Sequence, residues 1–419
     1  MHLIVLGAGV VGVTTAWHLR QAGHEVTVLE RRGGPAEETS YANGGQVSVS
    51  YARPWANPAA PAKIFGWLMQ EEAPLLFRLR ADLDQWRWGM RFLLECLPAR
   101  TRRNMAQIVR LGLYSQQRLR ALRAETGIHY DQRTQGILHF YTDSREFESA
   151  IQPVPLMQAL GCDRRIVDAD EAVRIEPALD GMRERLAGAT YTPEDESGDA
   201  RLFTKALAAR CETEGVRFRY NTRIEAIERG GAGLSGVRVI DNGRHELVSA
   251  DAYVLCLGSY SPLLTRPLGM RLPVFPVKGY SVTAPVREEA DAYTVSLTDD
   301  AYKLVYSRLG ERLRIAGTAE FAGYDPGLNL RRCRSIVRRA SECFPRGAHW
   351  DEAEFWAGLR PSTPSNVPLI GRTRYPELFV NTGHGTLGWT HACGAAAAVT
   401  DIIGGADPGV DFVFTGCRL

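Results

Sequence analysis

The first thirty residues contain two short hydrophobic runs, separated by a glycine-rich turn and an apolar segment with helical spacing. Leu3–Leu6 predicts a buried strand, Val10–Gln21 a helix that stops before Gly23, and Glu25–Glu30 a second strand. Together they predict a strand–helix–strand unit with parallel strands. Glycines interrupt the uncharged run from His2 to Leu19, and no basic residue precedes it, so we interpret it as neither a membrane span nor a signal peptide.

Later hydrophobic runs predict more strands of the same parallel sheet. Ala252–Leu257 is an apolar run that ends at Gly258, and Leu378–Asn381 precedes a long apolar helix over residues 386–403. Alternating hydrophobic and polar positions between residues 273 and 315 predict an antiparallel sheet instead. We therefore predict an α/β (α+β) fold, in which a Rossmann-like domain accompanies a second domain built on an antiparallel sheet.

The elements typical of a parallel sheet occur at the start, in the middle and near the end of the chain, so we expect the Rossmann-like domain to be discontinuous. The predicted Rossmann-like domain comprises 1–85, 185–262 and 350–419, and the second domain 86–184 and 263–349. The other predicted elements are strands at 136–142, 216–220 and 223–228, a hairpin region at 230–243, and helices at 144–182, 203–214 and 329–343.

Residues 55–110 are rich in tryptophan and arginine. The hydrophobic positions Leu79, Leu83, Trp86, Met90, Leu93 and Leu94 recur with helical spacing. One interpretation is a layer of helices packed on the protein itself. The other is a surface that contacts an anionic membrane interface, which aromatic and basic side chains suit.

Composition excludes several classes of protein. Apolar residues make up 45% and charged residues 23% of the 419 residues, as in an ordinary globular protein. The net charge of +2 gives no reason to expect nucleic acid as a partner. The eight cysteines form no C-x-x-C pair and lie at no zinc-finger spacing. We therefore expect no disulfide framework, no metal site and a cytoplasmic location.

The turn between the first strand and the first helix carries the pattern G-x-G-x-x-G over residues 7–12. Gly7 permits the tight turn, Gly9 lets a pyrophosphate approach the backbone, and Gly12 lets the helix pack closely on the sheet. The phosphates would then lie at the helix N-terminus, where free N–H groups favour an anion. Glu30 ends the second strand, where a carboxylate binds a ribose diol and repels a 2′-phosphate. The combination predicts a dinucleotide, either NAD or FAD.

Two further glycine-rich stretches are compatible with a flavin. Residues 38–46 (ETSYANGGQ) carry short polar side chains and paired glycines that can wrap phosphates, although a polar surface loop is equally compatible with this stretch alone. Residues 382–389 (TGHGTLGW) open the long C-terminal helix. Its bare N-terminus would face the side of a flavin that becomes negative on reduction. His384 by itself is as compatible with a structural role as with a functional one.

The Rossmann start, ETSYANGGQ, VLCLGSYSP, WAGLRP and TGHGTLGW occur in this order, and together they resemble the D-amino-acid oxidase and glycine oxidase superfamily of FAD enzymes. The resemblance covers nearly the whole chain. It implies FAD-dependent oxidative deamination of D-amino acids such as D-alanine to a keto acid and ammonia. The residues that it assigns to FAD are Gly7, Gly9, Val10, Val11, Gly12, Glu30, Arg31, Thr39, Ser40, Asn43, Gly44, Gly45, Gln46, Ile224, Gly258, Gly383, His384, Gly385, Thr386, Leu387 and Gly388.

In this superfamily the arginine of a G-[LF]-R-P stretch binds the substrate carboxylate, which implies that role for Arg360. A planar guanidinium suits the role because it offers two parallel hydrogen bonds. We expect the anchored amine to lose a proton and the α-hydrogen to leave as hydride, by positioning and electrostatics rather than through a required side-chain base. Tyr51, Tyr280 and Tyr302 are candidate lids or hydrogen-bond partners, although structural roles are equally compatible with them.

The resemblance further implies that electrons pass to a respiratory quinone or another non-oxygen acceptor, with peripheral contact at the cytoplasmic face of the inner membrane. Three alternatives remain open. The first is an oxidase of the same fold that uses oxygen on glycine, sarcosine or D-hydroxyproline. The second is an NAD-dependent dehydrogenase, and the third is a Rossmann-type binding subunit without catalysis.

Overall fold

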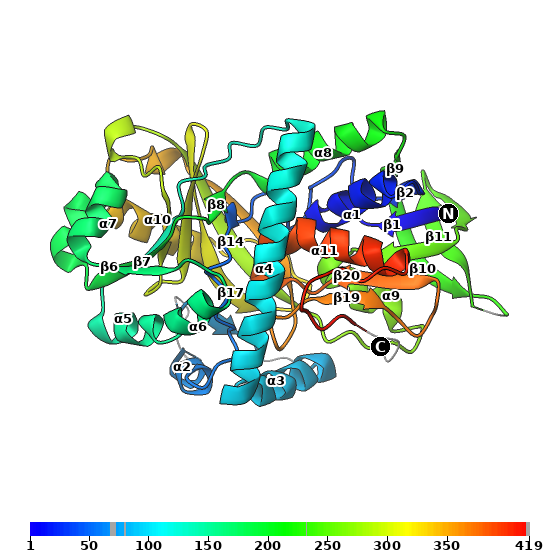
Figure 1. The fold of residues 1–419 in the computed structure, drawn as a ribbon, viewed down its shortest axis with the longest axis horizontal. Coiled ribbons are helices and arrows are strands. Elements are labelled where there is room, and N and C mark those ends of the chain that lie inside the picture. The colour runs from blue at the N-terminus through cyan, green and yellow to red at the C-terminus, as the bar shows by residue number, and fades with distance from the viewer. Residues whose placement is uncertain (68–72, 79–80, 232, 416–419) are drawn as a thin grey trace.

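A computed structural model describes residues 1–67, 73–78, 81–231 and 233–415, and these residues form two large β-sheets with helices around them (Figure 1). One sheet has six strands in the order β19-β20-β13-β1-β2-β9, and the other has nine. The predicted α/β (α+β) class, with a parallel and a mainly antiparallel part, is confirmed.

The six-stranded sheet forms from the hydrophobic runs that predicted it. Its strands are β1 (His2–Leu6), β2 (Glu25–Leu29), β9 (Arg217–Arg219), β13 (Ala252–Leu255), β19 (Leu369–Arg372) and β20 (Leu378–Thr382). Neighbouring strands pair in parallel, except that β19 pairs antiparallel with β20. The chain passes from β1 through helix α1 (Val10–Gln21) to β2, so the predicted strand–helix–strand unit is confirmed.

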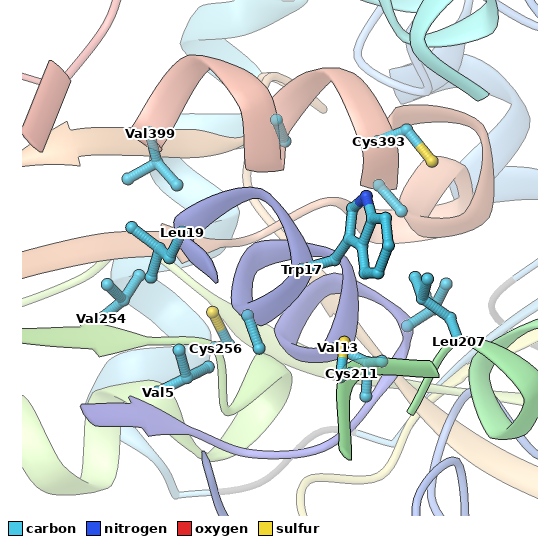
Figure 2. Packing of buried hydrophobic residues seen from close by; sticks show 14 of the residues in the cluster. Val5, Val13, Trp17, Leu19, Leu207, Cys211, Val254, Cys256, Cys393 and Val399 are labelled. Atoms are coloured by element: carbon cyan, nitrogen blue, oxygen red, sulfur yellow. The ribbon is translucent and has the colours of Figure 1, made fainter. Parts of the chain in front are cut away.

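A layer of helices covers one face of this sheet. The layer contains α1, α4 (Pro98–Thr126), α8 (Ala200–Thr213) and α11 (Gly388–Ile403). Figure 2 shows Trp17 of α1 between Cys393 of α11 and Leu207 of α8, with Val5 and Val254 of the sheet beneath α1. Alanines fill the middle of α11, so the helix can lie close to both α1 and α4.

A three-stranded antiparallel sheet covers the opposite face. It consists of β10 (Thr222–Arg229), β11 (Leu234–Asp241) and β12 (Arg244–Val248). Val237 and Val239 from this sheet join Ile4 and Leu255 from the six-stranded sheet in a hydrophobic cluster. The parallel strands are therefore buried on both faces, as their unbroken hydrophobic runs predicted.

The nine-stranded sheet collects strands from most of the chain length. They are β4 (Leu75–Phe77), β5 (Ile137–Tyr141), β6 (Arg165–Val167), β7 (Gly188–Thr192), β14 (Phe275–Pro285), β15 (Ser296–Asp299), β16 (Leu304–Leu309), β17 (Arg312–Phe321) and β18 (Glu354–Ser362). The pairs are antiparallel except for β15 with β5 and β17 with β4. The expected antiparallel sheet is thus largely, but not purely, antiparallel.

Short helices surround this second sheet. They are α5 (Ser144–Ile151), α6 (Val154–Ala159), α7 (Ala169–Ile175) and α10 (Leu330–Cys343). Helix α9 (Ser261–Thr265) follows β13 of the six-stranded sheet. Strands β3 (Gln46–Val47) and β8 (Glu196–Ser197) form a separate two-stranded sheet. Residues of α7 and α10 form a hydrophobic cluster with the sheet. The predicted helix at 329–343 begins at Leu330, because the Asn329 side chain caps it by accepting hydrogen bonds from the backbone N–H groups of Arg331 and Arg332.

Several elements had no counterpart among the predictions, and strand β6 interrupts residues 144–182, which were predicted to be helical. The 29-residue helix α4 runs past residue 110, where the predicted helical region ended. Strand β18 contains Arg360 and pairs along its whole length with β14. Its residues 354–362 lie within a segment assigned to the Rossmann-like domain, as do β4 and β7, yet all three strands belong to the nine-stranded sheet. The division of the chain into two domains stays a prediction.

The described residues between 55 and 97 form a small layer, mainly helical, that includes α2 (Ala60–Trp67) and α3 (Leu83–Glu95). We call it the layer at residues 55–97. Both helices lie along the lower edge of the molecule in Figure 1, beside one end of α4. Trp88 and Phe92 of α3 are buried against Phe275 and Phe321 of the nine-stranded sheet. The packing interpretation is therefore correct for one face of α3. Leu79 lies outside the described residues.

The seven cysteines within the described ranges are buried and unbridged, and Cys417 lies outside those ranges. None of the described helices combines the length and the apolar character that are needed to cross a bilayer.

The contact at Gly12 gives the first prediction. A Cβ atom at this position would lie 1.9 Å from the Gly7 carbonyl oxygen. This oxygen belongs to the backbone, so relieving the clash requires a shift of the backbone itself. We expect Gly12→Ala to lower the free energy of unfolding by about 1–3 kcal/mol or more, as overpacking does. Denaturant unfolding measures this change. Gly181→Ala is the matched control because its Cβ would meet no atom within 4 Å. Equal stability of the two variants would contradict the packing role of Gly12.

Candidate active site

A cavity of about 980 Å³ lies between the six-stranded and the nine-stranded sheets, and both contribute to its wall. The Rossmann side supplies Gly7, Gly9, Glu30 and the start of α11, and the other sheet supplies Arg360. The cavity therefore brings together residues that are up to about 380 positions apart in the chain.

The turn at the N-terminus of α1 forms one end of the cavity wall. Gly9, Val10 and Val11 line the cavity directly, beside Gly7. Gly7 has a φ of 105°, a left-handed conformation that glycine adopts without strain. Gly12 does not line the cavity, because it is turned toward the Gly7 carbonyl instead. The structure thus gives Gly12 a packing role, as the motif predicted.

Glu30 holds the end of β2 next to this turn. Its two carboxylate oxygens accept hydrogen bonds from the backbone N–H groups of Ala8, at 2.8 Å, and Arg32, at 2.9 Å. The side chain is buried, and burial raises the pKa of Glu30. Next to it, the Arg31 guanidinium lies 4.0 Å above the ring of Tyr260 and forms an ion pair with Glu38. Glu30 and Arg31 both line the cavity.

The loop at residues 39–46 folds over the same turn. The Ser40 hydroxyl accepts a hydrogen bond of 3.0 Å from the Val10 N–H, and the Thr39 hydroxyl donates to the Leu359 carbonyl at 2.8 Å. A Cβ atom on Gly44 would lie 2.6 Å from Val305, so glycine allows the loop to approach the nine-stranded sheet. The six predicted residues of this loop that line the cavity are Thr39, Ser40, Asn43, Gly44, Gly45 and Gln46.

The start of α11 forms a second wall. His384, Gly385, Thr386, Leu387 and Gly388 line the cavity, and a short 3-10 turn at Gly385–Leu387 precedes the helix. The predicted helix therefore begins two residues later than residue 386. Gly383 does not line the cavity. Its φ of 81° makes the bend that brings the following residues to the wall.

Two polar groups in this wall are buried without a hydrogen-bond partner. They are Nε2 of His384 and Oδ1 of Asn381. Burial, and then the neighbouring His391, lowers the pKa of His384 to about 3, so its imidazole is neutral at pH 7. Buried polar atoms in native proteins nearly always have a partner, so unpaired atoms in a cavity wall indicate that a ligand completes the set.

Arg360 lies on β18 and lines the cavity. Its guanidinium donates hydrogen bonds to the backbone carbonyls of Thr318, at 2.7 Å, and Gly317, at 3.3 Å. A Cβ atom on Gly279 of the adjacent strand would lie 2.2 Å from the guanidinium carbon, so this glycine makes room for the side chain. Burial lowers the pKa of Arg360 to about 10, which still leaves it protonated at pH 7.

The three predicted tyrosines lie in different environments. Tyr51 lines the cavity and stacks on His139 with 5.9 Å between ring centroids. Tyr280 also contributes to the wall, but its hydroxyl donates to Glu320 at 2.5 Å and its ring is buried. Tyr302 does not line the cavity: it is 48% exposed, and Arg339 lies 4.1 Å above its ring. The prediction that Tyr302 belongs to the site receives no support from this geometry.

A polar cluster that the sequence analysis missed lies next to Tyr51, and its histidine, His139, is buried. Asp300 accepts from Lys303 at 2.7 Å and contacts Nδ1 of His139 at 3.2 Å, while Nε2 of His139 lies 3.3 Å from the Ser50 hydroxyl. His139, Asp300 and Lys303 all line the cavity. The histidine interrupts an otherwise hydrophobic strand, which was the only local signal of its role.

Opposing effects determine the charges in this cluster. Burial lowers the pKa of His139 to about 4, so its ring is neutral at pH 7. Burial opposes ionisation of Asp300, but Lys303 and His139 outweigh it and hold the pKa of Asp300 well below its usual range. Burial raises the pKa of the Tyr51 phenol, which therefore stays protonated and can donate a hydrogen bond.

The Rossmann end of the cavity fits an FAD. Glycines at 7, 9 and 44–45 leave the backbone bare, and the two helix N-termini of α1 and α11 both reach the wall. Helix N-termini favour anionic groups, and the unpaired His384 and Asn381 atoms provide hydrogen-bonding positions. Ile224 and Gly258 also line the cavity, as predicted for the adenine side. The contacts of individual residues with FAD stay predictions.

Comparison with known proteins agrees with this fit. A family model described as FAD dependent oxidoreductase matches residues 2–402, so the chain belongs to this family of FAD-dependent oxidoreductases. Among its relatives, the D-amino acid dehydrogenase of Dechloromonas aromatica is 54% identical over 100% of both chains. The D-amino acid dehydrogenase of Paramagnetospirillum magneticum is 51% identical over 97% of this chain and 95% of its own.

Solved structures share the fold at low identity. The glycine oxidase from Geobacillus kaustophilus has a TM-score of 0.74 at 21% identity, covering 98% of this chain and 96% of its own. The L-proline dehydrogenase from P. horikoshii has a TM-score of 0.73 at 18% identity, covering 97% and 96%. The predicted resemblance, FAD as the cofactor and the classification as an oxidoreductase are confirmed. The NAD-dependent and the non-catalytic alternatives are thereby set aside.

Proposed function

We propose that this protein oxidatively deaminates D-amino acids, with D-alanine as a representative substrate, and passes the electrons to a quinone or another non-oxygen acceptor. The observation that carries the proposal is the protonated Arg360 guanidinium in the wall of the same cavity that fits FAD. The full-length similarity to proteins named D-amino acid dehydrogenase supports the choice of substrate.

Arg360 is positioned to bind the carboxylate of an amino acid. The carbonyls of Thr318 and Gly317 take up two of its N–H groups and fix the plane of the guanidinium, which has further N–H groups to offer a ligand. The Asp300 carboxylate, which also lines the cavity, is already paired with Lys303. A bidentate contact would fix the orientation of the substrate as well as its affinity.

Tyr51 supplies a neutral donor close to this position. Its phenol lies in the combined field of Arg360, Lys303 and Asp300. Neither His139 nor His384 carries a positive charge at pH 7, so neither repels the amino group of the substrate. Bound FAD supplies the hydride acceptor. The protein's part is to orient the α-carbon and to favour the neutral amine, after which the imino acid hydrolyses in water.

Helix α3 supports peripheral contact with a membrane. Leu83, Trp86, Met90, Leu93 and Leu94 all expose between 49% and 70% of their surface, although the opposite face of α3 is buried. Exposed arginines flank the apolar residues on α3 and on the start of α4. An exposed apolar stripe with basic neighbours matches an anionic lipid surface. We propose the cytoplasmic face of the inner membrane as that surface.

The proposed substrate class predicts the outcome of an anaerobic absorption titration. D-alanine should bleach the visible flavin band of the purified protein, whereas L-alanine should leave it unchanged. Bleaching by L-alanine alone, or by neither isomer, would contradict the proposal. In the same preparation, rapid oxygen uptake with D-alanine would favour the oxidase alternative over a quinone acceptor.

Arg360→Met should raise KM for D-alanine by about 10- to 100-fold, because a hydrogen bond to a charged group contributes roughly 1.5–3 kcal/mol. Steady-state kinetics with an artificial dye measures this change. Flavin content should stay as in the wild type, because Arg360 is not among the residues that are predicted to hold FAD. Arg360→Lys keeps the charge but loses the planar fork, so we expect an intermediate KM. An unchanged KM in the Met variant would remove Arg360 from the carboxylate site.

The membrane proposal predicts binding to vesicles that contain phosphatidylglycerol. The double variant Arg87→Glu/Arg91→Glu should bind them about 30-fold or more weakly in cosedimentation, because each basic residue near an anionic surface contributes about 1 kcal/mol. Arg174→Glu/Arg244→Glu is the matched control, with two exposed arginines on α7 and β12. The proposal requires that this control bind like the wild type; equal loss in both double variants would indicate a nonspecific charge effect and would overturn the assignment to α3.

A further inference from the structure

One part of the cavity wall is apolar and has no role in the chemistry described above. Its side chains come from the layer at residues 55–97 and from the adjacent edge of the nine-stranded sheet. They include Trp55, Ile64 of α2, Leu75 and Phe77 of β4, and Trp88 of α3. We call the space bounded by these five side chains the vestibule.

Helix α3 contributes its inner face to the vestibule, and its outer face is exposed to solvent. Trp88 and Phe92 of α3 face inward and line the cavity. Trp86, Met90 and Leu93 are about half or more exposed, and yet they also line the cavity. The cavity rim therefore reaches the exposed apolar stripe of α3, and the apolar surface continues from outside the protein to the inside.

An amino acid is a poor occupant of this space. A zwitterion needs a partner for its carboxylate and its ammonium group, and Trp55, Ile64, Leu75, Phe77 and Trp88 offer no charged group. Phe77 instead stacks on Phe321 with 4.5 Å between centroids, which leaves a flat aromatic surface. Such a wall suits an uncharged ring with an apolar tail.

We propose that the vestibule binds a lipophilic quinone, which enters the cavity from the membrane side of α3. The inference rests on the proposed function. The electrons balance: oxidation of the amino acid to the iminium releases two electrons and two protons, and the quinone takes up both pairs to become the quinol. The apolar continuity between the stripe on α3 and the vestibule gives the quinone a path that avoids water.

The test measures binding of ubiquinone-1, a short-chain quinone, to the FAD-loaded protein by quenching of tryptophan fluorescence, since Trp55 and Trp88 lie in the vestibule. The wild type should show saturable quenching. Ile64→Phe/Leu75→Phe fills the vestibule, and we expect it to weaken binding at least tenfold. Leu247→Phe is the matched control, because Leu247 is exposed on β12 and does not line the cavity.

A second double variant distinguishes loss of binding because the vestibule is filled from loss of binding because the protein misfolds. Ile64→Ala/Leu75→Ala enlarges the vestibule and should keep saturable binding. Equal affinity in the wild type and the Phe variant, no saturable quenching in the wild type, or loss of binding in the Phe and Ala variants alike would each overturn the proposal. Anaerobic bleaching by D-alanine should proceed at the wild-type rate in the Phe variant. If D-alanine bleached the flavin of the Phe variant more slowly while quinone binding was unchanged, the vestibule would be the route of the amino acid. That result would also overturn the proposal.

The same experiment distinguishes failure of this inference from failure of the proposed function. If no D-amino acid bleaches the wild-type flavin, the proposed function fails, whatever ubiquinone-1 does. If D-alanine bleaches the flavin normally and ubiquinone-1 binding is insensitive to the filling of the vestibule, only the assignment of the vestibule fails.

Discussion

The distance between helix α1 and the strand that precedes it depends on a contact between two pieces of backbone. Gly12 has no side chain, so its α-carbon can approach the Gly7 carbonyl to a distance that any Cβ would prevent. The N-terminus of α1 therefore comes directly to the end of β1, where it lines the cavity. Helices α8 and α11 pack on α1 in turn, around Trp17. The position of the second helix N-terminus at the cavity, that of α11, thus depends on the same close approach.

The cavity separates two kinds of electrostatic environment. At the Rossmann end, backbone N–H groups and helix N-termini favour an anion, and Glu30 is occupied by two N–H groups of its own chain. On the nine-stranded sheet, Arg360 keeps its proton despite burial, and the nearby His139 is neutral. Arg360 therefore attracts the carboxylate of one ligand, whereas the helix N-termini attract the phosphates of another. This division orients two ligands relative to each other before either makes a specific contact.

The layer at residues 55–97 contributes apolar side chains both to the interior of the protein and to its surface. One face of α3 packs on the nine-stranded sheet through Trp88 and Phe92, and the other face exposes Met90 and its neighbours. A helix that is apolar on both faces normally lies inside a protein. Its position at the edge of this molecule (Figure 1) is what connects the exposed apolar stripe to the cavity wall.

Local spacing was enough to predict the parts of this protein whose conformation is set by neighbours in the chain. The glycine turn, the strand–helix–strand unit and Glu30 follow from local spacing, because backbone freedom at a glycine or the end of a strand is decided within a few residues. Arg360 was assigned by the resemblance of its stretch to the superfamily, and its role stays a prediction. The polar cluster could not be found in this way. His139 and Asp300 are 161 positions apart, and they meet only because β5 pairs in parallel with β15 in one particular register. Tyr302 lies between β15 and β16 and does not line the cavity. Strand register also decides the surroundings of Arg360, whose facing glycine comes from β14. A shift of one residue in a strand pairing turns every side chain to the other face of the sheet. The sequence by itself therefore determined the cofactor fold and its turn, whereas only the tertiary structure decided which side chains share the cavity, since that depends on strand register between distant segments.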